Sequence, residues 1–271
     1  MSLILIGHLS LHGLAWIVIL TLVHQVPSSS LDYCEGELDF NNTIFVHPFN
    51  TWSNVSFFFV AWLQAVFMFL WKVSKREFIY TLILPIVTLQ LALASFLYHS
   101  ILYEWTAHWD VIAIFIYLGF ELGTSLTRVL EEWGWKGYLL ELWRVVIWVL
   151  SAAIASIITY AVPGFDEGIG NAIGAGICVF GIVVLELIVL YVQRDVTTIY
   201  GKALYLGIAL FTIPAVIVWQ VGVSPHPAPC EAHIYYVGHG TWHILISVSI
   251  FLLFLTRLVI RRSKSGRVIW E

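Results

Sequence analysis

The stretch YVGHGTWHILISVSIFLLFLTRLVI, residues 236–260, decides the fold of this chain. It carries one charged side chain, Arg257, and it is longer than the roughly 20 mostly apolar residues that a transmembrane helix needs. Apolar runs of this length favour helices over strands, because a helix satisfies its own backbone hydrogen bonds in lipid. The sequence therefore predicts a membrane-spanning helix that opens with His239 and His243, four residues apart.

Comparable apolar runs occur along the rest of the chain, and they predict seven further spans at residues 3–26, 51–71, 79–101, 108–127, 142–162, 168–192 and 203–222. The composition agrees, since 60% of the residues are hydrophobic and only 11% are charged, against about one quarter in a soluble domain. We expect an all-α, polytopic membrane helix bundle: a seven-transmembrane domain at 28–262, a hydrophobic segment at 1–27 and a basic tail at 263–271.

The first hydrophobic segment has two interpretations. It lacks a basic region at its start and is long for a signal peptide, which favours a retained membrane anchor. A cleaved signal is the alternative, and cleavage would leave seven spans with the new N-terminus outside. Both interpretations keep the topology of the remaining chain.

The thirteen Lys and Arg residues alternate between connections and so predict orientation. They follow the second, fourth, sixth and eighth spans, whereas the connections 27–50, 102–107, 163–167 and 223–235 contain none. Basic residues gather on the cytoplasmic side of membrane proteins. We therefore expect a multi-pass protein of an endomembrane (endoplasmic reticulum or Golgi) or the plasma membrane, with a cytoplasmic C-terminus.

Cysteines and a glycosylation sequon fit this topology. Cys34 and Cys230 both fall in non-cytoplasmic connections, where an oxidising compartment permits a disulfide, and Cys178 falls within a span. Two unpaired thiols are the alternative. Asn41-Asn42-Thr43 is a sequon in the same outer connection as Cys34, although such triplets are common by chance.

Five polar residues lie at the non-cytoplasmic ends of three remote spans. They are Ser95 and His99, Asp110, and His239 and His243. Residues four apart share one face of a helix, so each i, i+4 pair points in one direction. Three neutral imidazoles with one open position are typical of a catalytic zinc site. A lone buried histidine is more often a packed core residue, but the convergence of three with an aspartate favours zinc.

Other polar residues are weaker candidates. Glu121 and Glu186 are buried by position, and we expect structural pairing with polar neighbours rather than a place in a cavity. The remaining histidines that we considered lie in the first segment, which has no acidic partner, or in a Pro-rich outer connection: His8, His12, His24, His226 and His233.

An acidic segment precedes the second span. Asp32-Tyr33-Cys34-Glu35-Gly36-Glu37-Leu38-Asp39 holds four carboxylates in eight residues, and Gly36 permits a tight turn. Clustered oxygen ligands suit calcium. A solvated acidic loop with no bound ion is the alternative that residues alone favour.

Together these motifs resemble the alkaline ceramidases, within a superfamily of seven-helix lipid hydrolases that includes the adiponectin receptors. The superfamily pattern is Ser95-x3-His99, then Asp110, then His239-x3-His243 in the last span. Asp32-Tyr33-Cys34-Glu35 is similar to the family's Asp-Trp-Cys-Glu, and residues 49–54, FNTWSN, look like its Asn-Thr-x-Ser-Asn. The resemblance covers roughly residues 32–262.

The resemblance implies roles for these residues. It implies zinc at His99, His239 and His243, with Asp110 and Ser95 as catalytic residues: Asp110 acts on water, and Ser95 helps to hold water or the oxyanion. It further implies a structural calcium ion and a Cys34–Cys230 disulfide. The calcium ligands that it implies are Asp32, Tyr33 through its carbonyl, Glu35 and Glu37.

The chain also departs from the family pattern. Tyr33 stands for Trp, and Glu37 stands where ceramidases often carry Asn. His47 stands in place of the last acidic calcium ligand, and Asp39 is a candidate substitute. The N-terminal segment is longer than in the shorter animal ceramidases.

We therefore expect a zinc enzyme that hydrolyses the amide bond of ceramide to a sphingoid base and a free fatty acid. One alternative is zinc-dependent hydrolysis of another lipid, at an ester or an amide. Another is a non-enzymatic membrane receptor with a structural zinc. The bilayer and a lipid substrate are the expected partners; we expect no nucleic acid, and no protein partner is indicated.

Overall fold

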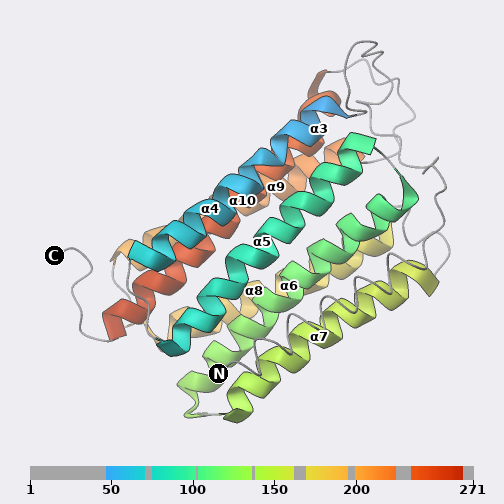
Figure 1. The fold of residues 1–271 in the computed structure, drawn as a ribbon. Helices are drawn as coiled ribbons and strands as arrows, with labels where there is room; N and C mark the ends of the chain where they lie inside the picture. The colour runs from blue at the N-terminus through green and yellow to red at the C-terminus, as the bar shows by residue number, and fades with distance from the viewer. Residues whose placement is uncertain are drawn as a thin grey trace.

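The computed structural model is a bundle of long helices that run in roughly the same direction along the molecule (Figure 1). The ranges that the structure describes are 47–70, 75–101, 103–135, 138–161, 169–194, 199–223 and 233–264. Within them the helices are α3 (Pro48–Ser53), α4 (Val55–Leu70), α5 (Lys75–Ile101), α6 (Glu104–Glu132), α7 (Tyr138–Ala161), α8 (Ile169–Val192), α9 (Ile199–Val223) and α10 (His233–Lys264). The first hydrophobic segment lies outside these ranges.

The predicted bundle is confirmed. The short helix α3 and α4 form one span with a break at Asn54, and five further helices are also long and apolar enough to cross a membrane. In α7 the apolar stretch is shorter, Leu142–Ile154. Each core span that the sequence predicts corresponds to one of these helices. α10 begins at His233, so the prediction that this residue belongs to the preceding loop is wrong.

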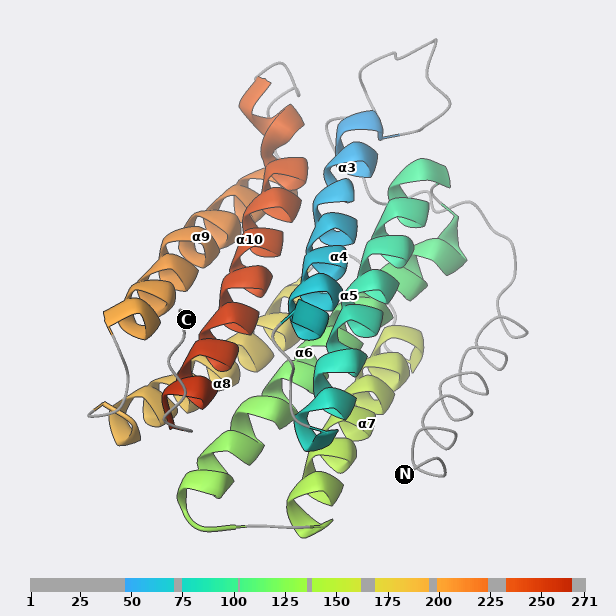
Figure 2. The same cartoon turned by 60° about the vertical axis from the view of Figure 1, so that its left-hand side comes forward.

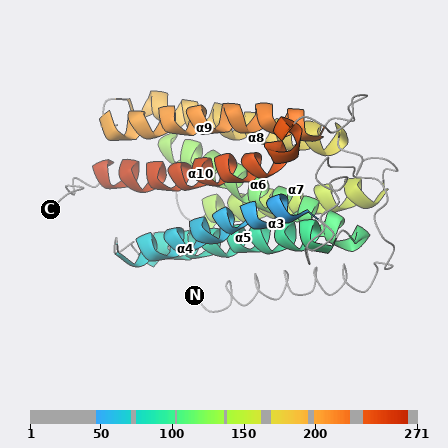
Figure 3. The same ribbon diagram turned by 90° about the horizontal axis from the view of Figure 1, so that it is seen from above.

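Helix α6 occupies the middle of the bundle, where it packs against α5, α7 and α8. Helix α10 packs against α9, α4 and α3, and α4 packs against α5. Viewed from above, α8 and α9 lie at one side of the bundle and α4 and α5 at the other (Figure 3). The core consists of apolar side chains from α4, α5, α6, α7 and α10, such as Phe57, Leu91, Phe120 and Phe254.

Helices α8 and α9 expose rows of large apolar side chains. Phe180 on α8 is 70% exposed, and Leu206 and Leu210 on α9 are 61% and 62% exposed. Water would make such surfaces costly, whereas lipid tails cover them without penalty. The exposed rows therefore support a bilayer as the surroundings of these helices.

A second feature is a buried group of charged side chains in the half of the bundle away from His239. We call Glu121, Arg128, Glu186 and Arg257 the arginine–glutamate cluster. Glu186 on α8 forms ion pairs with Arg128 on α6 and Arg257 on α10, and Arg257 also pairs with Glu121 on α6. The expectation of structural pairing for both glutamates is confirmed.

Hydroxyl groups complete the arginine–glutamate cluster. Ser125 and Tyr205 each donate a hydrogen bond of 2.8 Å to Glu186, so that α9 joins the cluster as well. Tyr117 donates to Glu121 at 3.2 Å. The polar side chains thereby link four helices through contacts that are shielded from lipid and water.

Three arginines differ from their predicted positions. The distribution of basic residues predicts Arg128, Arg144 and Arg257 at the membrane face, but each is at most 7% exposed. Arg144 donates from Nε to the Thr127 hydroxyl at 2.9 Å, and the other two pair with glutamates. Buried partners on neighbouring helices hold these guanidinium groups inside the bundle, and the orientation now rests on the other basic residues.

Candidate metal centre

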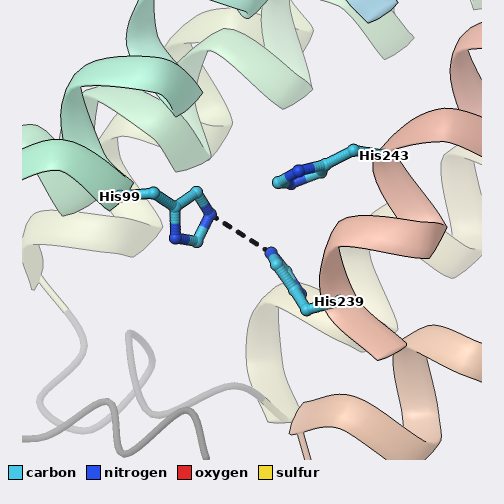
Figure 4. Close-up of side chains that lie close together, drawn as sticks. All are labelled: His99, His239 and His243. Carbon is cyan, nitrogen blue, oxygen red and sulfur yellow. Dashed lines mark hydrogen bonds between the residues drawn. The ribbon is translucent and has the colours of Figure 1, made fainter. Parts of the chain in front are cut away.

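Helices α5 and α10 bring three histidines together at one end of the bundle (Figure 4). His99 lies in the last turn of α5, and His239 and His243 lie on consecutive turns near the start of α10. We call these residues the histidine triad. Figure 4 shows the His99 ring facing the two rings from α10. The four-residue spacing of the sequence therefore serves to aim two side chains at a partner from another helix.

The triad is compact and buried. The ring centroids are 5.0 Å apart for His99 and His239, 5.2 Å for His99 and His243, and 4.6 Å for His239 and His243. One ligand atom from each residue lies within 4.8 Å of the others. His99 and His243 expose no surface, and His239 exposes 6%. The three imidazoles thus face one another in surroundings from which water is excluded.

The nitrogen geometry fits a tetrahedral metal ion. Nε2 of His99 and Nε2 of His239 are 3.2 Å apart. Zinc binds histidine nitrogen at about 2.0–2.1 Å, which places two ligands of a tetrahedral ion about 3.3–3.4 Å apart. Among the described residues, the buried Nε2 of His243 has no hydrogen-bond partner. An ion bound by the three Nε2 atoms would use a lone pair from each ring.

The tautomer of His243 follows from its contact with Ser53. Oγ of Ser53 lies 2.8 Å from Nδ1 of His243 and 2.8 Å from the Asn50 carbonyl oxygen. The hydroxyl has one proton, and a carbonyl can only accept, so that proton goes to Asn50. With the Ser53 proton on Asn50, Nδ1 of His243 is the donor to Ser53, and this tautomer leaves a lone pair on Nε2 for a metal.

His47 lies beside the triad. Its Nδ1 is 3.5 Å from Nδ1 of His99, and its backbone N–H donates to the His99 carbonyl at 3.0 Å. The residue is 1% exposed, and burial lowers the pKa of His47 to about 4, so the ring is neutral at physiological pH. The sequence analysis placed His47 near the calcium ligands, whereas the structure brings it against a triad ligand.

Asp110 and Ser95 lie near the same end of the bundle, on α6 and α5. Both are buried, the Ser95 side chain lies close to the Asp110 carboxylate, and Oδ1 of Asp110 has no hydrogen-bond partner among the described residues. Asp110 does not belong to the group of mutually close ligand atoms that the histidines form. The carboxylate is thus not a fourth member of this donor group.

Several predicted residues lie outside the described ranges. The calcium ligands Asp32, Tyr33, Glu35 and Glu37, and Asp39 with them, belong to this group, and calcium stays a prediction. Cys34 and Cys230 also lie outside, as do His8, His12, His24 and His226. Cys178 is a free thiol on α8, within a span as expected.

The sequence alone predicts no role for Ser53 and no contact between His47 and the triad. Ser53 belongs to the FNTWSN motif that supported the family resemblance, and that motif was the only available signal. Comparison with known proteins adds no assignment: no protein-family model matches the chain, and no curated protein matches it.

Proposed function

We propose that this protein is a zinc-dependent lipid amidase that hydrolyses ceramide to a sphingoid base and a free fatty acid. The observation that carries the proposal is the triad, three buried imidazoles whose ligand nitrogens lie within 4.8 Å of one another between α5 and α10. Three protein ligands with one open position are typical of catalytic zinc, whereas structural zinc usually has four. The absence of Asp110 from the donor group therefore favours an enzyme over a receptor with a structural ion.

His99, His239 and His243 would hold the zinc ion. A zinc ion at this position would supply Lewis acidity, which lowers the pKa of water toward neutrality and polarises a carbonyl oxygen. The protein supplies the surroundings: the three rings are buried among aromatic side chains such as Trp242 and Phe57. Exclusion of bulk water strengthens every electrostatic interaction at the reacting centre.

Asp110 would serve as the proton carrier. Its Oδ1 is buried and has no hydrogen-bond partner in the described ranges, so this atom can accept a proton from the attacking water. The Ser95 hydroxyl contacts the same carboxylate and would hold it in one orientation. The proton on Asp110 can then pass to the nitrogen of the leaving amine as the amide C–N bond breaks.

The lipid surroundings support a lipid substrate. The wide apolar faces of helices such as α8 and α9 support a substrate that stays in the bilayer. The resemblance to ceramidases selects ceramide among lipids with an amide or ester bond. We further propose that the triad lies toward the lumenal or extracellular leaflet, because the remaining basic residues follow the opposite ends of the spans.

A lipid panel with purified protein tests the proposal. The protein is assayed in detergent with ceramide, a phospholipid ester and an N-acyl amide that lacks the sphingoid base, and free amine and fatty acid are measured. We expect free sphingoid base from ceramide, its loss after chelation, and its return when zinc is added. Turnover of the ester alone would identify an ester lipid, not ceramide, as the substrate. If a zinc-loaded protein turned over no lipid, the proposal that the protein is an enzyme would be rejected.

A further inference from the structure

The six-residue helix α3 contacts the histidine triad from both of its ends. Figure 2 shows α3 between α10 and α5, the two helices that carry the triad. His47 precedes the helix as its N-cap residue, and Ser53 is its last residue. Pro48 occupies the first helical position, where its fixed φ favours helix initiation and its missing N–H costs nothing.

The start of α3 contacts the ligand from α5. Two atoms of His47 take part, because its ring nitrogen faces Nδ1 of His99 and its backbone N–H donates to the carbonyl of His99. If Nε2 of His99 offers its lone pair to a metal, Nδ1 carries the proton and donates to His47. His47 lies against the opposite nitrogen of the His99 ring and is not part of the donor group.

The end of α3 contacts a ligand from α10. Ser53 is held by its hydrogen bond to Asn50 one turn earlier, so its oxygen is fixed where Nδ1 of His243 must donate to it. Asn54, the C-cap residue, also donates from its side chain to the Asn50 carbonyl at 2.8 Å. These bonds lock the last turn of α3 independently of the triad.

Close packing fixes α3 against α10. A Cβ atom at Gly240 would lie only 2.4 Å and 2.5 Å from two ring carbons of Phe49, so only glycine permits this approach. Gly240 lies between the two triad residues of α10, and Phe49 lies between the two contacts of α3. The contact between Phe49 and Gly240 therefore fixes the position of the short helix on α10.

We infer that α3 is a positioning element for the metal ligands, in which His47 fixes the ring of His99 and Ser53 fixes the ring of His243. This inference rests on the zinc site of the proposed function. Metal-bound histidines generally donate their second ring N–H to a fixed acceptor, and loss of that acceptor costs about 10–100-fold in metal affinity or activity. Here one helix supplies the acceptor for two ligands that come from different spans.

Zinc affinity of the purified full chain tests the inference without any lipid substrate. The variants are Ser53→Ala, His47→Leu, and His47→Gln, which keeps an acceptor at this position. Ser56→Ala is the matched control for Ser53, because Ser56 donates to the Ser53 carbonyl at 2.7 Å and contacts only the backbone of His243. His108→Leu is the control for His47, since His108 is buried, 8% exposed, and outside the donor group.

Competition with a fluorescent chelator gives the zinc dissociation constant, and the visible spectrum of the cobalt-substituted protein reports ligand geometry. We expect zinc binding to weaken about 10–100-fold in Ser53→Ala and in His47→Leu, with a changed cobalt spectrum. His47→Gln should recover part of the loss, and both controls should bind zinc as the wild type does.

The outcomes separate the two proposals. A Ser53→Ala protein that matches Ser56→Ala in zinc affinity and cobalt spectrum overturns the inference, even where His47→Leu fails to fold. If the wild type binds zinc, weakens with these substitutions and hydrolyses no lipid, the inference stands and the proposed function fails. A wild type that binds no zinc removes both.

Discussion

The histidine triad and the arginine–glutamate cluster are both buried in an apolar bundle, but they balance their charges differently. In the cluster, Glu186 accepts hydrogen bonds from four side chains, two of them guanidinium groups. In the triad, three basic rings face one another, and Nε2 of His243 has no hydrogen-bond partner in the part of the chain that the structure describes. The charges of the cluster are paired with one another, whereas the triad would gain a partner by binding a cation.

This difference separates a group that stabilises the fold from one that binds. Ionisable residues within spans are costly, and they persist when they pair with each other or serve a function. Mutual pairing explains the cluster, which lies along α10 about 21 Å from His243, from the rise of fourteen helical residues to Arg257. Among the described residues, the three imidazoles converge without a carboxylate in their donor group, so ligand binding is the better account of the triad.

The largest effect should come from removal of a triad ligand. We expect His243→Ala to lose zinc at stoichiometric concentrations and to lose more than the 10–100-fold in activity that an outer partner costs. Metal content after dialysis, measured by mass spectrometry, checks this together with ceramide turnover. His108→Ala should keep both. The thermal midpoint of the chelator-treated variant should match that of chelator-treated wild type, and a large drop there would make the triad a structural cluster like the other one.

Asp110 should affect activity without affecting the metal. Asp110→Asn keeps the shape of the side chain and an oxygen for the Ser95 contact, but it is a far poorer proton acceptor than a carboxylate. We expect kcat to fall by about 10²–10⁴-fold, the usual contribution of a general base, while zinc content stays unchanged. Loss of zinc in this variant would instead place Asp110 among the ligands.

Glu186→Gln should destabilise the protein and leave the triad intact. The amide would turn an N–H₂ group toward donors that now point at a carboxylate, and it would leave Arg128 and Arg257 undercompensated. Breaking a buried pair in this way costs about 3–5 kcal/mol. The apparent free energy of unfolding in mild detergent measures the loss, with zinc affinity measured in parallel at a temperature where the variant is folded.

Glu132→Gln is the matched control for that substitution. Glu132 ends α6 near the same half of the bundle, and its Oε1 accepts from Nε2 of Gln193 at 2.6 Å. The residue is half-buried, so the loss should stay below about 1 kcal/mol, as for exposed pairs. Equal destabilisation by the two substitutions would contradict the distinct role of the arginine–glutamate cluster.

The two polar clusters also differ in how far the sequence predicts them. The triad was predicted because its signals are local: long apolar runs define the spans, and four-residue spacing places His239 with His243 on one face. Its convergence with His99 needed only the alternation of the spans across the membrane. The sequence predicts that Glu121 and Glu186 each pair with polar neighbours, but no local pattern identifies Arg128 and Arg257 as those neighbours.

The contacts around the triad could not be predicted from the sequence for the same reason. Ser53 and His243 are 190 residues apart, and His47 and His99 are 52 apart, so neither contact leaves a periodic signal. In the family resemblance His47 stands in place of the last acidic calcium ligand, and nothing in that pattern predicts its ring against His99. Side-chain contacts between remote helices depend on packing that apolar patterns do not encode.

The smallest predicted effect concerns Gly240, which allows α3 to approach α10 beside the triad. Gly240→Ala places a methyl group against the Phe49 ring and 3.1 Å from the Ser53 hydroxyl. The ring must move, and overpacking of this kind costs about 1–3 kcal/mol. Because Ser53 shares the short helix with Phe49, we expect weaker zinc binding as well as a lower free energy of unfolding.

Gly176→Ala is the control for this change, because a Cβ atom there meets nothing within 4 Å. In the helix α8 it should be neutral or stabilising by up to about 1 kcal/mol, since alanine favours helices over glycine. The double variant Phe49→Ala/Gly240→Ala removes the clash and should recover zinc affinity relative to Gly240→Ala alone. If Gly240→Ala lowers stability but leaves zinc affinity unchanged, α3 supports the fold at this point without positioning the triad.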